Sequence, residues 1–272
     1  MAKTKEAAEI QVVKVQRGRV EFCILGTSPI ILNRMSEKAR HVLLLPNPPG
    51  KTRSGLKHDP YAEFLASPYT DPDARGQTYL MCLAASFKKA LCGAALDLPG
   101  ATKAQLGRLT WVEGERLGLY GVPQLFMSVT RCADTNRTPD IRTRVIVPKW
   151  ACRVAINFAK PIINETLIAN LLVAAGMTQG IGDWRAEKGS GNYGSFEVVG
   201  ADNPEFNRII KTGGRKAQQA AMQTPEFYDE ESHEMFQWFK AEVAARGKTD
   251  LLKHEQKAAK AKKLKAEPVG AS

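Results

Sequence analysis

The chain has 272 residues, of which 39 are Lys or Arg and 28 are Asp or Glu, so its formal net charge is +11 at pH 7. This balance, with a sequence pI of about 9.5, favours an anionic partner. No run of residues reaches the length of a membrane span, and the N-terminus lacks the apolar core of a secretion signal, so we expect a cytoplasmic protein without a membrane partner.

Strand and loop patterns account for the first part of the chain. Residues 20–31 are predicted as a strand that continues past a Gly-Thr-Ser-Pro turn, and residues 36–40 as a short helical turn capped by Ser36. Residues 46–78 form a long irregular insertion rich in Pro, Gly, Asp and Ser. Connections of this kind are usually either functional or disordered.

A helix is predicted over residues 79–96. Its apolar positions recur at helical spacing and form one face, made of Leu80, Leu83, Ala84, Phe87, Leu91 and Ala94. Lys88 and Lys89 fall on the flank and back of that face. Alone, the pattern favours a core helix with solvated lysines, but beside a phosphate-binding surface the same lysines would extend a cationic track.

Two strands are predicted over residues 121–130 and 140–158, with the polar link 134–139 between them in the manner of a hairpin. Arg142 and Arg144 are two residues apart, so their side chains leave the same face of a strand. Two interpretations remain open. The guanidinium groups either meet successive phosphates or keep a solvent-facing edge strand from aggregating.

Residues 150–199 form a βαβ-like unit. Residues 150–158 alternate apolar and polar side chains, which predicts a half-buried strand. Asn164 is the predicted N-cap of a helix whose apolar positions recur at i, i+3, i+4 and i+7 and which ends at Gly176. The chain then returns through a glycine-rich loop to a strand over residues 193–199.

The glycine-rich loop, residues 180–196, has a composition suited to a phosphate backbone. Glycine permits positive φ and close approach of a ligand, consecutive amides bind anions, and cations and rings supply charge and stacking. The alternative is a long connection whose aromatic residues cover the edge of a core. The candidate nucleic-acid-binding residues of the loop are Gly180, Gly182, Trp184, Arg185, Lys188, Gly189, Gly191 and Tyr193.

These segments together resemble the RAMP superfamily, the repeat-associated proteins best known from CRISPR effector complexes. The segment SFKKAL, residues 86–91, is similar to a family helix segment of the form Ser-Phe/Leu-Lys-Gly-Ala-Leu, and the late glycine-rich loop is a second likeness. Where the family has glycine, this chain has Lys89. The segments GTSPIILNR (26–34), SEKAR (36–40) and GIGDWRAEKG (180–189) look like a family of phage and prophage proteins.

The resemblance implies an α+β fold, with a ferredoxin-like or RRM-like RAMP core of βαββαβ order, insertions and a C-terminal helical tail. The expected division is an N-terminal arm at residues 1–18, a core at 19–200 that contains the insertion 46–78, and a helical appendage with a basic tail at 201–272. The implied activity is the coating of RNA or single-stranded DNA by subunits of a filament. Fold-level likeness supplies an expectation about function and no proof.

The pattern changes after residue 200. Residues 202–214 are predicted as a linker, and Thr224-Pro225-Glu226 as a helix start with proline at the first helical position. The apolar stripe of that helix either packs on the core or docks on a neighbouring subunit, and consists of Tyr228, Met235, Phe236, Phe239 and Val243, with Trp238 beside it. The Ala/Lys-rich end of the chain is predicted as a solvated helix face or a disordered arm.

The sequence leaves one enzymatic and one structural alternative open. The five cysteines lack a CxxC pair and are predicted to be buried thiols, and the sequence contains no Walker loop, nucleophile elbow or metal-ligand spacing of histidines. One alternative is a metal-independent RNA endonuclease in which His41 or His58, with Lys57 and Tyr61, exchanges protons. The other is a virion assembly protein whose basic tail neutralises packaged nucleic acid.

The sequence therefore favours non-catalytic binding of single-stranded nucleic acid by a homo-oligomer, with neither cofactor nor metal. The loop amides, Arg185 and Lys188 are expected to hold phosphates, and Trp184 and Tyr193 to stack on bases. Four further cations are expected to extend the track, namely Lys88, Lys89, Arg142 and Arg144.

Overall fold

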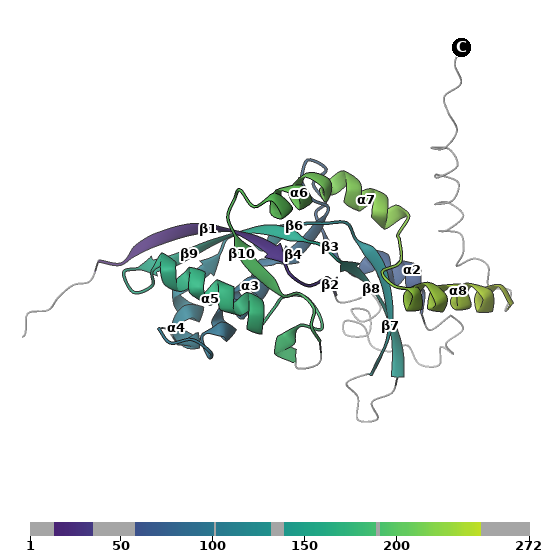
Figure 1. The fold of residues 1–272 in the computed structure, drawn as a ribbon, viewed down its shortest axis with the longest axis horizontal. Coiled ribbons are helices and arrows are strands. Elements are labelled where there is room, and N and C mark those ends of the chain that lie inside the picture. Colours follow the sequence, from purple (N-terminus) through teal and green to yellow (C-terminus); the bar gives the residue numbers. More distant parts are fainter. Residues whose placement is uncertain (1–13, 35–57, 101, 132–138, 189–190, 246–272) are drawn as a thin grey trace, which may run out of the picture.

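The computed structural model describes residues 14–34, 58–100, 102–131, 139–188 and 191–245. Over these residues the chain is a mixed α+β structure in which seven α-helices pack around a curled antiparallel sheet that resembles half of a barrel (Figure 1). The α+β class expected from the sequence is confirmed. The predicted helical turn at residues 36–40 and the first part of the insertion, residues 46–57, lie outside the described residues.

The larger sheet has seven strands in the order β10-β1-β9-β6-β4-β3, with β5 also paired to β9. Every pair of neighbours in it is antiparallel. Its strands are β1 (Gln16–Gly26), β3 (Tyr69–Thr70), β4 (Leu80–Leu83), β5 (Thr110–Val112), β6 (Arg116–Tyr120), β9 (Ala151–Lys160) and β10 (Phe196–Val199). Strand β9 is the most buried because helices cover both of its faces.

The smaller sheet has the order β2-β8-β7, with β2 at Ile30–Leu32, β7 at Gln124–Arg131 and β8 at Pro139–Val147. Strands β7 and β8 pair in antiparallel register from Gln124 opposite Ile146 to Arg131 opposite Pro139, so the predicted hairpin is confirmed. Its second strand, predicted over residues 140–158, is wrong in extent, because β8 ends at Val147 and β9 belongs to the larger sheet. One face of this sheet packs into the main core through Leu125 and Val145. The other face carries Phe126 and Ile146 beneath the glycine-rich loop.

The predicted single strand over residues 20–31 is wrong, because the chain turns between two strands of different sheets. Strand β1 ends at Gly26, where an added Cβ atom would lie 2.2 Å from Trp150 Nε1. The indole Nε1 donates to the carbonyl oxygen of Ser28 at 2.8 Å and fixes the turn. Strand β2 then leaves toward β8.

The predicted helix over residues 79–96 begins later than expected. Residues Leu80–Leu83 form β4, which pairs with β3 and β6, and helix α3 (Ala84–Ala94) follows. Leu80 and Leu83 are spaced as on a helical face, whereas Leu80 and Cys82 are spaced as on one face of a strand, so pairing with β6 decides the conformation. The predicted apolar face of α3 is buried at Phe87 and Leu91, and α3 packs between helix α5 (Glu165–Thr178) and helix α4 (Lys103–Leu109).

Helix α5 matches its prediction most closely. The Asn164 side chain accepts a hydrogen bond from the Leu167 backbone N–H at 2.8 Å, and the predicted apolar face is buried. The helix was predicted to end at Gly176, but it continues to Thr178. Gly176 lies within the helix because β10 crosses there, and an added Cβ atom would lie 1.9 Å from the Phe196 carbonyl oxygen.

The predicted linker at residues 202–214 is wrong. Helix α6 (Pro204–Thr212) begins there with Asn203 as its N-cap, and buries Phe206 and Ile209 on the face of the larger sheet opposite α3 and α5. Helix α7 (Arg215–Gln223), which the sequence did not reveal, follows directly. In Figure 1 both helices lie above the sheet, and α4 and α5 lie below it.

The last described helix, α8 (Glu230–Ala245), begins later than the predicted start at Pro225, because residues 226–228 extend along the edge of β7. Of the predicted stripe, Phe236 and Val243 are buried, whereas Trp238 is 62% exposed. Helix α2 (Pro60–Ala66), within the predicted insertion, packs on β8. No helix in the described ranges is long and apolar enough to cross a membrane.

The cysteine prediction is confirmed where the structure describes it. The thiols of Cys23, Cys82, Cys92 and Cys152 are free and buried, and Cys132 lies outside the described residues. Burial raises the pKa of the Cys152 thiol well above its ordinary value, and the neighbouring Cys82 raises it further.

Candidate nucleic-acid interface

The glycine-rich loop is a packed segment held by backbone hydrogen bonds. The Ile181 N–H donates to the Gly194 carbonyl oxygen at 2.9 Å, and the Asp183 N–H donates to the Ile31 carbonyl oxygen at 3.0 Å. The Gly194 N–H donates in turn to the Pro29 carbonyl oxygen at 2.8 Å. The loop is therefore fixed to the β1–β2 turn and lies over the smaller sheet.

The glycines serve this close packing. Gly194 has φ of 74°, and an added Cβ atom would lie 1.7 Å from the Ile181 carbonyl oxygen. Gly182 has φ of 85°, and its Cβ atom would meet Ile30 and Ile31. Gly180 and Gly191 also approach backbone of the loop, whereas Gly189 lies outside the described residues. Close approach to the protein's own backbone therefore accounts for these glycines.

The loop places two aromatic side chains on the smaller sheet. Trp184 has φ of 51°, a conformation that costs a non-glycine residue about 1–2 kcal/mol. Its ring meets Phe126 of β7 edge to face at 5.9 Å between centroids and Tyr193 at 6.2 Å. Tyr228, which precedes α8, also meets Phe126 edge to face at 5.6 Å. We call Phe126, Trp184, Tyr193 and Tyr228 the aromatic cluster.

Phe126 is the buried centre of this cluster, and the other three rings are half-buried around it. Burial raises the pKa of the Tyr193 phenol, and the neighbouring Tyr228 and Asp229 act in the same direction. The phenol therefore stays protonated at neutral pH and can donate a hydrogen bond. A partly open group of rings of this kind can stack on planar ligands.

Arg144 is the predicted cation that lies against the cluster. Its guanidinium carbon is 5.2 Å from the Trp184 ring centroid, and its Nη1 atom is 2.7 Å from Asp183 Oδ2. The contact with Asp183 is ionic, since Nη1 has no partner in hydrogen-bond geometry within the described ranges. Burial lowers the pKa of Arg144, and the Asp183 carboxylate partly offsets that effect.

The other predicted cations differ in the contacts that they form. Arg142 pairs with Asp140 at 2.9 Å, and Arg185 pairs with Glu187 at 2.6 Å while it donates to the Gly182 carbonyl oxygen. Lys88 is half-buried and Lys89 exposed on α3, and no described contact joins either lysine to the aromatic cluster. The backbone of Lys188 ends a short 3-10 helix (Ala186–Lys188). The structure thus brings Arg144, Trp184 and Tyr193 together and pairs the predicted arginines with carboxylates.

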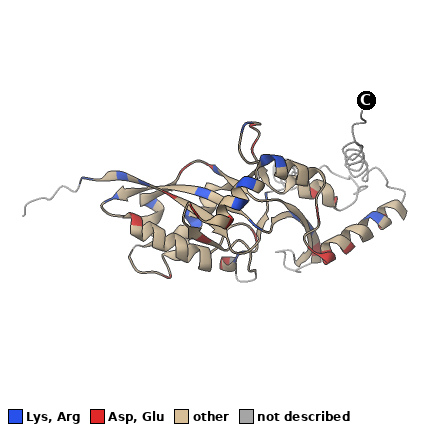
Figure 2. Cartoon of the chain, turned by 45° about the horizontal axis from the view of Figure 1, so that its top comes forward, with Lys and Arg blue, Asp and Glu red and all other residues tan. Residues whose placement is uncertain are grey.

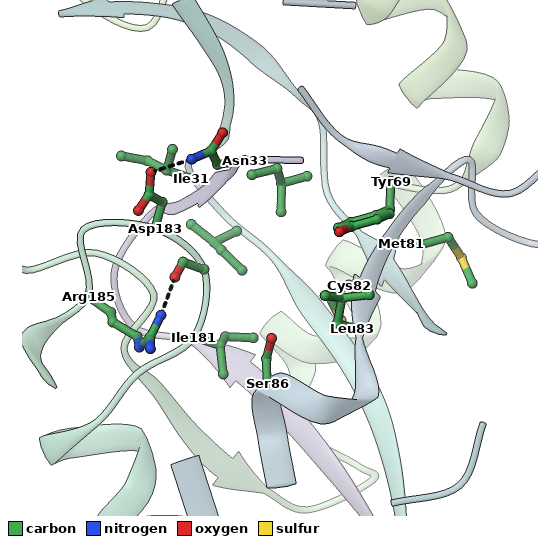
Figure 3. Close-up of a pocket in the computed structure, with 13 residues that line it drawn as sticks. Ile31, Asn33, Tyr69, Met81, Cys82, Leu83, Ser86, Ile181, Asp183 and Arg185 are labelled. Atoms are coloured by element: carbon green, nitrogen blue, oxygen red, sulfur yellow. Dashed lines mark hydrogen bonds between the residues drawn. The ribbon is translucent and has the colours of Figure 1, made fainter. Parts of the chain in front are cut away.

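A cavity of about 220 Å³ lies beside the loop. Figure 3 shows Asp183 and Arg185 on one wall and Tyr69, Met81, Cys82 and Leu83 on the other, with Ser86 of α3 between them. Trp184 lies between Asp183 and Arg185 in sequence and contributes to the aromatic cluster, so one loop borders both features.

Two arginines that no sequence pattern singled out lie against Tyr69, one of the residues that line this cavity. The guanidinium carbons of Arg34 and Arg116 are 5.9 Å and 5.2 Å from the ring centroid of Tyr69, which lines it. Neither arginine forms an ion pair with any carboxylate of the described residues. No local pattern indicates this group, because Arg34, Tyr69 and Arg116 come from distant parts of the chain.

Two residues of the endonuclease alternative, His58 and Tyr61, contact other parts of the fold. His58 lies between two carboxylates, with Nδ1 2.7 Å from Glu63 Oε1 and Nε2 2.8 Å from Asp140 Oδ1. Both ring nitrogens therefore contact carboxylates, and the imidazole connects α2 to β8. The Tyr61 hydroxyl donates to the Gln223 carbonyl oxygen at 2.9 Å. His41 and Lys57 lie outside the described residues.

The charge of the described residues is mixed. In the view of Figure 2, basic and acidic residues are interspersed along the helices and strands. Among the described residues, no carboxylate forms an ion pair with the two arginines beside Tyr69. Neither a protein-family model nor a curated protein matches this chain.

Proposed function

We propose that this chain binds single-stranded nucleic acid, RNA or DNA, without catalysis. The observation that carries the proposal is the aromatic cluster with the Arg144 guanidinium against the Trp184 ring. Rings stack on bases of any sequence, with a contribution of about 1–3 kcal/mol per base, and nearby cations attract phosphates. The net charge of +11 supports an anionic partner.

We also propose that the core is ferredoxin-like and of the RAMP type, related to phage and prophage proteins. The strand order β10-β1-β9-β6 supports this, because in a ferredoxin-like βαββαβ sheet the fourth strand lies beside the first, and the first beside the third. Helices α3 and α5 occupy the expected places before β6 and between β9 and β10. The β7–β8 hairpin and the segment from β2 to β4 would then be insertions.

Equilibrium binding to labelled strands tests the proposed function. In buffer with a chelator, we expect single-stranded RNA and DNA of about 20 nucleotides to bind with little sequence preference and more tightly than a duplex of the same length. The RNA should remain intact, which separates binding from metal-independent cleavage. Preference for duplex, or an affinity that does not respond to salt, would overturn the proposal.

The proposed assembly is a homo-oligomeric filament on the bound strand. Sedimentation of the protein alone and with strands of increasing length tests it. We expect the mass of the complex to grow with strand length. Particles that form equally without nucleic acid would favour the virion assembly alternative.

A further inference from the structure

The cavity beside the glycine-rich loop is small. At about 220 Å³ it has the volume of roughly seven water molecules, and it is smaller than the roughly 300–1,000 Å³ pockets that take drug-sized ligands. It therefore suits a single planar ring system, and a whole nucleotide would project from it.

The lining combines apolar walls with a few polar groups. Ile31, Leu83 and Ile181 supply apolar surface, and the cavity is completed by polar side chains that include Asn33, Asp183 and Ser86. Figure 3 shows the Asn33 amide joined to the Asp183 carboxylate, a bond of 3.0 Å, and the Ser86 side chain between the two walls. A heteroaromatic ring with hydrogen-bonding edges matches such a lining.

Two cations suited to an anionic group attached to that ring lie beside the lining residue Tyr69 and do not line the cavity themselves. Arg34 and Arg116 lie against Tyr69, and no carboxylate of the described residues neutralises them. In contrast, Arg144, Arg142 and Arg185 each have an acidic partner. Within the part of the chain that the structure describes, the two arginines beside Tyr69 therefore have charge available for a phosphate group.

We propose that this cavity receives one unstacked nucleobase of the bound strand, and that Arg34 and Arg116 hold the adjoining phosphates. The inference rests on the proposed function and assigns it a specific subsite. The strand would pass from the aromatic cluster to the cavity across the loop segment 182–185, which borders both. Insertion of the base would give the cluster and the cavity successive positions along the strand.

The wild-type chain provides the first test. Fluorescence anisotropy compares a single strand with an abasic strand of the same length and charge. If stacking and insertion contribute about 1.4 kcal/mol or more, the base-containing strand binds at least about tenfold more tightly. Failure to bind either strand would overturn the proposed function itself. Equal binding of both strands would overturn the nucleobase site while nucleic-acid binding survives.

A cavity-filling variant locates the effect. Ser86→Phe should remove most of the advantage of the base-containing strand and leave affinity for the abasic strand unchanged. Ala85→Phe is the matched control, because Ala85 is exposed on the same helix and does not line the cavity. Should Ser86→Phe lose its cooperative melting transition, Ser86→Leu replaces it. A folded filled variant with an undiminished advantage would overturn the site.

A charge variant tests the phosphate contacts. For Arg34→Ala combined with Arg116→Ala, we expect the slope of log affinity against log salt to fall by about 1.4 for single strands, the value for two lost phosphate contacts. Lys103→Ala with Arg108→Ala is the control, because it removes the same charge from exposed positions on α4. Equal slopes for the two double variants would overturn the assignment of Arg34 and Arg116.

Discussion

Arg144 of β8 and Asp183 of the glycine-rich loop form an ion pair of 2.7 Å that joins the smaller sheet to the loop. The side chains are only 12% and 29% exposed, so neither charge is fully hydrated. Asp183 also accepts from the Asn33 amide at 3.0 Å. The carboxylate therefore holds the backbone that carries Trp184, and it orients the guanidinium beneath that ring.

Asp183→Asn should destabilise the fold, because it leaves the Arg144 guanidinium largely buried without its counter-charge. We expect the free energy of unfolding to fall by about 1–3 kcal/mol, measured by urea denaturation. Asp202→Asn is the matched control at an exposed aspartate. Equal denaturation midpoints for the two variants would contradict a structural role for the ion pair.

Gly194→Ala should destabilise the fold more strongly. Its φ of 74° and the 1.7 Å distance from an added Cβ atom to the Ile181 carbonyl oxygen both oppose a side chain, so we expect a loss of about 2 kcal/mol or more. Gly107→Ala in α4 provides the contrast, because nothing lies within 4 Å of its added Cβ atom. That helical substitution should gain up to about 1 kcal/mol. Similar melting temperatures for both variants would show that the loop is not packed as described.

Secondary structure was predicted best where local signals were complete. Helix α5 has a capping Asn164 and an apolar face along its own length, so the sequence sufficed. Helix α6 has only two buried apolar residues, Phe206 and Ile209, between proline and glycine, so its stability depends on packing against the larger sheet. Strand β4 has apolar spacing that also fits a helix, and pairing with β6 decides its conformation.

The candidate site was predictable only in part. Trp184 and Tyr193 were identified from the loop composition, and the structure brings them together on Phe126. The carboxylate partners of the predicted arginines could not be foreseen, because Asp183 meets Arg144 only through the fold. Tyr69 lay within a segment predicted as an irregular insertion. Of its two arginines, Arg116 lies in β6 and Arg34 follows the end of β2, so no sequence spacing relates them.

The buried Cys152 thiol predicts a loss of stability in alkali. Burial raises its pKa in the folded chain, so above the ordinary value of 9.0 the unfolded chain releases the proton first and the free energy of unfolding falls as pH rises. Urea denaturation between pH 8 and 10 measures this, with Cys152→Ala as the control that removes the titrating group. A pH dependence that is the same in both proteins would exclude the thiol as its cause.

Removal of residues 248–272 should weaken nonspecific affinity through lost charge and leave the described core folded, because this Ala/Lys-rich stretch has little apolar surface to bury. Thermal denaturation and binding to a single strand in parallel measure both effects. If the shortened chain loses its cooperative transition, the boundary of the folded core lies further toward the C-terminus.

The aromatic cluster is best tested by locating the strand on the protein. A single strand that contains 4-thiouracil is bound to the full chain and irradiated, and cross-linked residues are identified by mass spectrometry. We predict cross-links to Trp184, Tyr193 or Tyr228, the half-buried rings of the cluster. Cross-links confined to residues 246–272, with none at these three rings, would contradict the proposed interface and assign binding to the basic tail alone.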